Sequence, residues 1–174
     1  MSKILVVVYS YTGTCRRLAE LLCDDQGWPI AEVTDARPRS GALGTWRCLL
    51  DSWLRRQPPI HYTGLPPHDF DAVVLVAPIW AYRLAGPMRT FVASRREHLP
   101  EVAVAPVMGG SGASNAITEI GHLLGRVPIL SAAFTAREVE DGSCAARLRA
   151  FGDGVRAAQA ADVTRPAIWS PQTA

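Results

Sequence analysis

The hydrophobic positions of this chain form two kinds of segment that alternate along its 174 residues. Short, continuous apolar runs rich in β-branched residues are typical of strands that are buried on both faces of a sheet. Longer segments with apolar residues three or four positions apart are typical of helices that bury one side. We interpret the apolar runs at 3–9, 28–34, 70–77, 102–108 and 127–134 as strands.

The segments between these runs carry the helical spacing. We predict helices over 14–26, over 46–56, after Pro87, after the stretch 109–114 and over 141–161, and an extended loop around Pro58, Pro59, Pro66 and Pro67. Because strands and helices alternate, we expect an α/β fold with five parallel strands, right-handed crossovers and helices on both faces of the sheet. We expect one domain over 1–163 and an irregular tail over 164–174.

The turn after the first predicted strand is rich in hydroxyl groups. Residues 10–14 read SYTGT and place Ser10, Thr12 and Thr14 around Gly13. Hydroxyls donate hydrogen bonds to phosphate oxygens, glycine permits close backbone approach, and the free amides of a helix start favour an anion. The spacing is neither G-x-x-x-x-G-K nor G-x-G-x-x-G, which argues against a triphosphate or a dinucleotide pyrophosphate. The turn therefore predicts a site for one terminal monophosphate, and the alternative is that Thr12 or Thr14 merely caps the helix.

Two further loops at strand ends carry aromatic rings and glycines. Trp80 and Tyr82 follow the third predicted strand and are candidates to sandwich a flat heterocycle, although Trp80 is equally compatible with packing beneath its loop. Residues 109–112 follow the fourth strand and read GGSG, which brings backbone amides close to a ligand or forms a flexible turn. Ligands of open parallel sheets bind at the carboxyl ends of strands. Together the three loops predict one ligand with a phosphate and a flat ring.

Composition narrows the classes of function. Hydrophobic residues make up 48% of the chain and charged residues 20%, and the net charge of +2 forms no basic stripe that would favour nucleic acid. The apolar start is too short for a signal peptide, and no run reaches the roughly 18 residues of a membrane helix, so we expect a cytoplasmic protein. The cysteines show no CxxC or metal-ligand spacing, so we expect free thiols and no metal site. They are Cys15, Cys23, Cys48 and Cys144.

The three loops in this order resemble the flavodoxin-like family of FMN-binding proteins. The phosphate loop of that family is a hydroxyl residue, any residue, Ser or Thr, Gly, any residue, Thr, and Ser10, Thr12 and Gly13 match it. The stretches RSGALG, APIWAYRLAGPMRTFV and VMGGSGASNAITEI resemble a subgroup of small NAD(P)H-dependent oxidoreductases in that family. The resemblance implies the strand order 2-1-3-4-5 and FMN as cofactor. It implies a phosphate held by Ser10, Tyr11, Thr12, Gly13, Thr14 and Cys15, and a ring held by Pro78, Ile79, Trp80, Ala81, Tyr82 and Arg83 and by Gly109, Gly110, Ser111 and Gly112.

The sequence departs from the family in two respects. Cys15 replaces the last threonine of the phosphate loop and is a weaker donor, for which the Thr14 hydroxyl compensates. The chain is also slightly basic, whereas electron-carrying flavodoxins are usually acidic. If Arg83 lies beside the flavin N1–C2=O edge, it stabilises the anionic reduced flavin and favours two-electron transfer, and the alternative is a solvated arginine. Arg83 and Tyr82 are the candidate catalytic residues.

Two hypotheses about the function follow, and they concern different classes of protein. The first is a redox protein that takes electrons from NAD(P)H or a protein partner and reduces quinones or similar acceptors, or that acts as a flavodoxin-type electron carrier. The second, suggested by Cys15, is a binding or regulatory module that keeps the fold without flavin. The basic helix over 46–56, with Trp46 and Trp53 on one face, is expected to pack on the sheet. It is also compatible with a homodimer surface, a redox-partner site, a quinone-pocket wall or a membrane contact.

Overall fold

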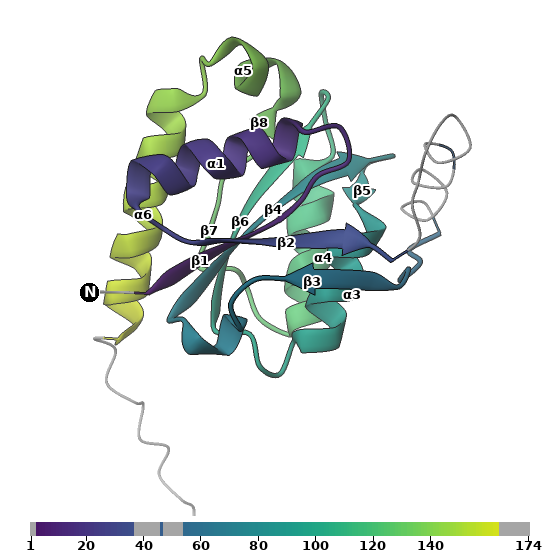
Figure 1. Ribbon diagram of the computed structural model, residues 1–174, viewed down its shortest axis with the longest axis horizontal. Coiled ribbons are helices and arrows are strands. Elements are labelled where there is room, and N and C mark those ends of the chain that lie inside the picture. Colours follow the sequence, from purple (N-terminus) through teal and green to yellow (C-terminus); the bar gives the residue numbers. More distant parts are fainter. Residues whose placement is uncertain (1–2, 37–45, 47–53, 164–174) are drawn as a thin grey trace, which may run out of the picture.

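A parallel sheet forms the centre of the computed structural model, which describes residues 3–36, 46 and 54–163 (Figure 1). The sheet order β2-β1-β4-β6-β7 is the predicted order 2-1-3-4-5, with the short strands β7 and β8 both paired to β6 in the fifth place. The parallel strands are β1 (Ile4–Tyr9), β2 (Ile30–Asp35), β4 (Ala72–Trp80), β6 (Glu101–Met108), β7 (Leu130–Ser131) and β8 (Phe134–Thr135).

Two antiparallel strands lie where the sequence predicts loops. β3 (Ile60–Thr63) pairs with β2 and forms one edge of the sheet, so the extended loop predicted around the four prolines is wrong at these residues. β5 (Arg83–Leu84) pairs with the end of β4. A four-residue edge strand bounded by prolines is physically reasonable, because only one side of it must pair. In place of the five-stranded sheet predicted from the sequence, the described residues form an eight-stranded sheet with a parallel centre.

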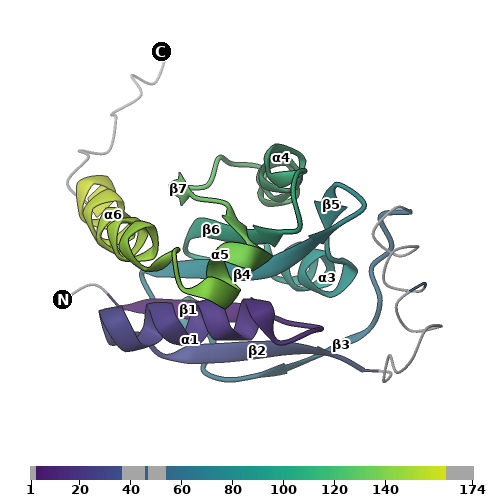
Figure 2. The ribbon, with the colours of Figure 1, turned by 90° about the horizontal axis from the view of Figure 1, so that it is seen from above.

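Helices cover both faces of the sheet, as predicted. The apolar cluster on one face includes side chains of α1 (Thr14–Gln26), α5 (Ala136–Asp141) and α6 (Ala145–Val163), and the cluster on the other includes those of α3 (Gly86–Arg95) and α4 (Ala113–Leu124) (Figures 1 and 2). A short 3-10 turn (Pro67–Asp69) precedes β4. The closing helix begins later than predicted, because residues 136–141 form a helix of their own that ends at Gly142 with φ +78°.

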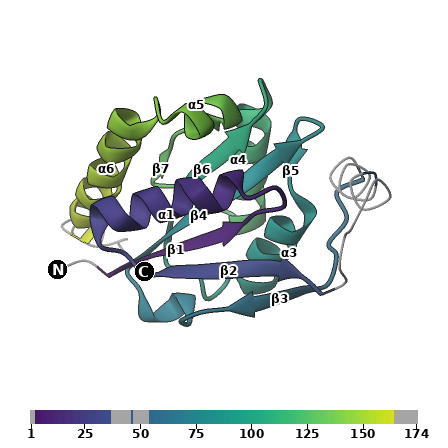
Figure 3. The same ribbon diagram turned by 45° about the horizontal axis from the view of Figure 1, so that its top comes forward.

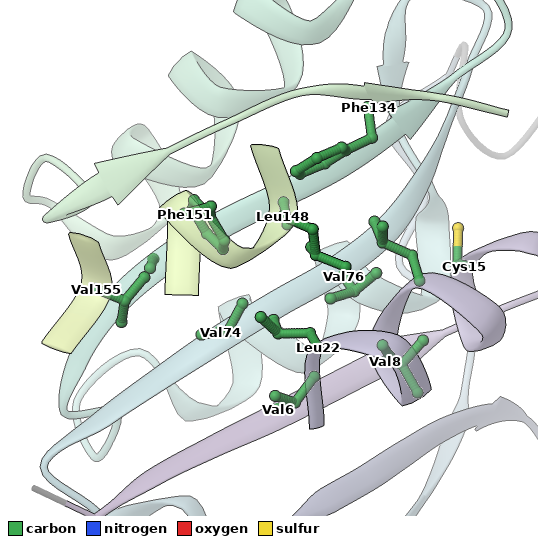
Figure 4. Close-up of a cluster of buried hydrophobic side chains, with 14 of the residues drawn as sticks. Val6, Val8, Cys15, Leu22, Val74, Val76, Phe134, Leu148, Phe151 and Val155 are labelled. Carbon is green, nitrogen blue, oxygen red and sulfur yellow. The ribbon is translucent and has the colours of Figure 1, made fainter. Parts of the chain in front are cut away.

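Two apolar clusters stabilise the fold, one on each face of the sheet. Alternate residues of β1 enter different clusters: Val6 and Val8 face α1 and α6, whereas Leu5 and Val7 face α3 and α4. Figure 4 shows the first cluster, in which Leu148, Phe151 and Val155 of the closing helix point inward, as predicted. Strands buried on both faces explain why β1 reads as an unbroken apolar run.

Several predictions fall partly or wholly outside the described residues. The predicted helix over 46–56 was expected to pack on the sheet. Trp46 and Leu54 are exposed, so this prediction is wrong for these two side chains. Residues 47–53 lie outside the described part. The predicted tail over 164–174 lies outside it as well. Cys15, Cys23 and Cys144 are free thiols, as expected. In the described part of the chain, no helix has the length and apolar content needed to cross a membrane.

Candidate functional site

Three loops meet at one end of the sheet, where β1, β4 and β6 reach their carboxyl ends (Figure 3). β1 pairs with β2 on one side and with β4 on the other, so the chain changes its direction of winding between β1 and β4. Ligands of open parallel sheets bind outside such a switch point. The loops that sequence reasoning singled out are therefore in the place where this fold forms sites.

The β1–α1 turn (residues 10–13) keeps its hydroxyl groups available. Gly13 is the residue that precedes α1, with φ +96°, and no side chain caps the helix. The hydroxyl oxygen of Ser10 accepts a hydrogen bond from the Gly13 N–H at 3.1 Å, and the Thr12 and Thr14 hydroxyl oxygens lie 3.4 Å apart. The alternative interpretation, in which Thr12 or Thr14 exists to cap the helix, is therefore wrong.

The space around this turn is open. A Cβ atom added at Gly13 would meet no atom within 4 Å, and Thr12 is exposed. The first amides of an α-helix have no acceptor within the helix, and its dipole places partial positive charge there. Hydroxyl donors, free amides and open space together suit a small anion such as a phosphate.

Cys15 does not take part through its side chain. It is 3% exposed and belongs to the cluster beneath α1, beside the sheet (Figure 4). Burial raises the pKa of its thiol to about 12, so the group is protonated at neutral pH. The expectation that the Cys15 thiol contributes to a phosphate site is thus wrong, because the side chain points into the core. Only its backbone N–H remains available to an anion at the helix start.

The second loop is a β-hairpin (residues 79–84). β4 runs through Pro78 and Ile79 to Trp80, and the chain turns back at Ala81 and Tyr82 to pair Arg83 with Trp80. Ala81 and Tyr82 both have positive φ, +48° and +61°, which is rare for residues other than glycine. Backbone strain of this kind persists only where surrounding structure holds it, and it is concentrated at functional sites.

Aromatic side chains connect the hairpin to the β1–α1 turn. The Trp80 ring makes edge-on contacts with Tyr9 and Tyr11, with ring centroids 6.0 and 5.7 Å away. Trp80 is half-buried, so its side chain packs against these neighbours and is still partly exposed. Tyr82, at the hairpin tip, is 62% exposed. The two rings predicted to hold a flat heterocycle therefore differ: Trp80 is fixed by its neighbours, and Tyr82 faces solvent.

The third loop (residues 109–112, the β6–α4 turn) lies against the hairpin. Gly109, Gly110 and Ser111 are exposed, and a Cβ at either of these two glycines would meet nothing within 4 Å. Gly112 has φ +105°, and a Cβ there would lie 2.8 Å from the Tyr82 Cα atom. The structure thus brings the second and third loops into direct backbone contact, as a ring site shared between them requires.

A buried ion pair that sequence reasoning missed supports the hairpin. Arg89 of α3 is 2% exposed and forms a salt bridge through Nε with the Glu119 carboxylate of α4. Its other guanidinium nitrogens donate to the carbonyl oxygens of Arg56, at 3.0 Å, and Leu84, at 2.9 Å. Arg89 therefore joins α3, α4 and β5. No local signal in the sequence marks it, since arginines are usually exposed.

Arg83, the candidate catalytic residue, borders a cavity beside the hairpin. Its side chain lines a cavity of about 750 Å³ together with α4 residues that include Asn115 and Thr118. The structure therefore places Arg83 on the hairpin that carries Trp80 and also in the wall of a neighbouring cavity. Among the described residues, no group of three or more His, Cys, Asp or Glu side chains is arranged to hold a metal ion.

Comparison with known proteins defines the fold. No family model matches the chain, and no curated protein matches it in sequence. A flavoprotein from Lactobacillus acidophilus NCFM, solved in complex with FMN, is similar with a TM-score of 0.67 and 21% identity, over 82% of this chain and 99% of that one. A flavodoxin, WrbA-like protein from Agrobacterium tumefaciens has a TM-score of 0.54 and 13% identity, over 95% of this chain and 100% of that one.

A flavodoxin from the domain Archaea is also similar, with a TM-score of 0.50 and 15% identity over 90% of this chain and 99% of that one. These likenesses, the strand order and the switch point agree. The chain has the flavodoxin-like fold, and the resemblance seen in the sequence is confirmed at that level.

Proposed function

We propose that this chain binds FMN and functions as a redox protein. The observation that carries the proposal is the β1–α1 turn, which has open space beside Gly13 and three hydroxyl groups that do not cap α1, at the sheet end where Trp80 also lies. A phosphate bound there places an attached ring beside the hairpin and the β6–α4 turn. The similar flavoprotein solved with FMN supports the choice of this ligand over other phosphate-bearing heterocycles.

The residues fit the two ends of FMN. Ser10, Thr12 and Thr14 and the first amides of α1 would hold the phosphate, because hydroxyl and backbone donors to a charged group make strong hydrogen bonds. Residues 78–83 and 109–112 would hold the ring. When bound, FMN supplies the electron-transfer chemistry, and the protein positions the ring and sets its electrostatic surroundings.

The finer proposal is that the chain is an NAD(P)H-dependent reductase of quinones or similar acceptors. Its support is the slight positive charge of the chain and Arg83 on the ring-side hairpin. A cation near the reduced ring would stabilise negative charge there and raise the two-electron reduction potential. The alternative within the same class is a flavodoxin-type electron carrier, which needs no substrate pocket.

Titration with FMN tests the proposal. We expect the purified chain to quench FMN fluorescence, and the double variant Thr12→Ala/Thr14→Ala to bind FMN at least about tenfold more weakly, since each hydrogen bond to a charged group contributes about 1.5–3 kcal/mol. The control is Thr63→Ala, at an exposed position of the edge strand β3. Equal affinity of the double variant and the wild type would contradict the phosphate assignment. A colourless protein unaltered by FMN would support the flavin-free module.

Turnover and potentials test the finer proposal. Oxidation of NADH or NADPH in the presence of a quinone would support a reductase, and reversible reduction without turnover would support a carrier. We expect Arg83→Gln to lower the two-electron potential of bound FMN by roughly 30 mV for each 1.4 kcal/mol of lost stabilisation. Arg96→Gln, an exposed arginine at the end of α3, is the control. An unchanged potential would remove Arg83 from the electrostatic role and leave FMN binding intact.

A further inference from the structure

A polar cavity lies beside the hairpin, on the side of α4. Its volume is about 750 Å³, which is within the range of small-molecule sites. The walls come from β5, from the segment 55–57, from α4 and from Arg89 of α3. The side chains that line it and are free of the buried ion pair are Arg55, Gln57, Arg83, Asn115, Thr118 and His122, with Leu123 at its border.

One face of α4 is built for this cavity. Asn115, Thr118, Glu119 and His122 are three or four positions apart, so they lie on one side of the helix. Ala116 and Ile120 lie on the other side and are fully buried against the sheet. The helix therefore buries one face in the core and presents a row of hydrogen-bonding side chains to the cavity with the other.

The cavity carries net positive charge. Glu119 is the one acidic side chain among the described residues that line it, and that carboxylate already pairs with the buried Arg89. Arg55 and Arg83 have no ion-pair partner in the described part of the chain. Two guanidinium groups without counter-ions, next to neutral donors such as Asn115 and Thr118, favour an anion, because arginine binds phosphate and carboxylate in bidentate geometry.

The cavity also adjoins the proposed ring site. Trp80 and Arg83 are register partners across the β4–β5 hairpin. Directly paired residues of an antiparallel hairpin project their side chains to the same face. Trp80 contacts the aromatic rings of Tyr9 and Tyr11, and Arg83 is among the residues that line the cavity. The proposed cofactor site and the cavity thus share this pair of the hairpin, so molecules bound in the two places would lie close together.

We infer that this cavity binds the anionic group, a phosphate or a carboxylate, of a small co-substrate of the flavin site, with Arg55 and Arg83 as its ligands. The co-substrate role rests on the proposed function. Binding of the anion does not, because all of the groups involved belong to the chain. The anion comes either from the electron donor, as the extra phosphate of NADPH, or from a carboxylate on the acceptor.

Calorimetric titration with inorganic pyrophosphate tests the site directly. We expect the FMN-loaded full chain to bind it, and Arg55→Gln and Arg83→Gln each to weaken binding at least about tenfold, the usual cost of one charge-assisted hydrogen bond. Arg83→Lys should retain part of the affinity, and Arg96→Gln, the control, should leave it unchanged. Raising the salt concentration should weaken binding to the wild type. Absent binding, or equal affinity in all variants, would overturn the inference.

Matched substrate pairs then identify the source of the anion. The pairs are NADPH against NADH, and a naphthoquinone carboxylate against its methyl ester. We expect the wild type to have a lower KM for the anionic member of one pair, and Arg55→Gln to abolish that preference through KM while kcat changes less. The pair whose two members differ in KM identifies whether the anion belongs to the electron donor or to the acceptor. If neither pair is discriminated, or if the preference survives Arg55→Gln, the inference is wrong.

Failure of the flavin proposal would give a different result. FMN affinity is measured separately. If the chain binds FMN but not pyrophosphate, only the inference that the cavity binds an anion is wrong. A chain that binds no FMN overturns the proposed function and, with it, the co-substrate role. In that case pyrophosphate binding that is lost in Arg55→Gln/Arg83→Gln but kept in Thr12→Ala/Thr14→Ala still assigns the anion to the cavity.

Discussion

The β1–α1 and β6–α4 turns share one backbone design and have opposite surroundings. Each follows a central parallel strand and ends in a glycine that precedes the helix without a side-chain cap. Gly13 has φ +96° and ψ −20°, and Gly112 has φ +105° and ψ 0°. L-residues rarely adopt such values, so each turn requires glycine for its conformation alone.

The difference lies in what each turn faces. A Cβ at Gly13 would meet open space, whereas a Cβ at Gly112 would collide with the backbone of Tyr82. The first turn is therefore open to a ligand, and the second is closed by the hairpin that it supports. Local sequence therefore specifies the conformation of each turn, while the neighbouring element decides whether the turn is left open or is closed by packing.

Loss of the buried ion pair that supports the hairpin should change the stability of the protein most. We expect Arg89→Met to lower the free energy of unfolding by about 3–5 kcal/mol, because it leaves the Glu119 carboxylate without its buried partner. Urea unfolding measures this change. Arg96→Met, at the exposed end of α3, is the matched control and should have little effect.

A second variant separates lost charge pairing from lost packing. Adding Glu119→Gln to Arg89→Met removes the unpaired charge and should recover part of the stability. If Arg89→Met costs no more than Arg96→Met, Arg89 does not hold the hairpin against α4.

The next effect in size tests whether the β6–α4 turn is closed by the hairpin. Gly112→Ala should destabilise the protein by about 3 kcal/mol, because a strained φ and a collision with backbone each cost about 1–3 kcal/mol. Gly109→Ala, in the same turn but with open space around it, should change stability by less than about 0.5 kcal/mol. Thermal or urea unfolding of the two variants checks this. Similar losses for both would mean that the hairpin yields and that the turn is not closed.

A smaller effect tests whether the hydroxyls of the open turn are structural. Thr135 caps α5, with its hydroxyl oxygen accepting from the Glu138 N–H at 3.2 Å, so Thr135→Ala should cost about 1 kcal/mol of stability. Thr14→Ala should leave stability unchanged, because Thr14 caps nothing. FMN affinity should show the reverse pattern. If Thr14→Ala loses as much stability as Thr135→Ala, the Thr14 hydroxyl has a structural role.

The smallest effect is the pH dependence of that capped helix start. Hydrogen bonds from the Thr135 backbone and hydroxyl lower the pKa of Glu138 from its ordinary value of 4.5. Its carboxylate therefore stabilises the fold above about pH 4.5, and this contribution is lost as the pH falls through the lowered pKa. We expect wild type to exceed Glu138→Gln in stability at pH 7, and the difference to shrink by pH 3. A difference that is constant with pH would exclude the charge as its source.

Much of the fold could be predicted because its signals are local. The predicted bounds of the first helix, 14–26, are those of α1, since Gly27 ends the helix with φ +70°. β3 was missed because four residues between prolines give too short a pattern, and its pairing with β2 is a tertiary feature. α5 could have been found, because Thr135 and Glu138 have the spacing of a capping box.

The site was predicted less completely than the fold. The loops were located correctly, because they interrupt apolar runs with hydroxyls, rings and glycines. The hairpin was missed because Ala81 and Tyr82 lack the Asn-Gly signal of a tight turn. No local sequence pattern predicts that Cys15 points inward or that Arg89 pairs with Glu119, because both features depend on side chains from distant segments.

Because Cys15 is buried, the rate at which its thiol is modified would measure how often the start of α1 opens. Alkylating reagents attack only the thiolate, and this thiol is both shielded from solvent and held protonated. Modification of Cys15 in an otherwise cysteine-free chain would therefore proceed only through transient excursions that uncover it. A molecule clamped across the turn above should slow that modification in step with its own occupancy, so the rate would report binding without any chromophore.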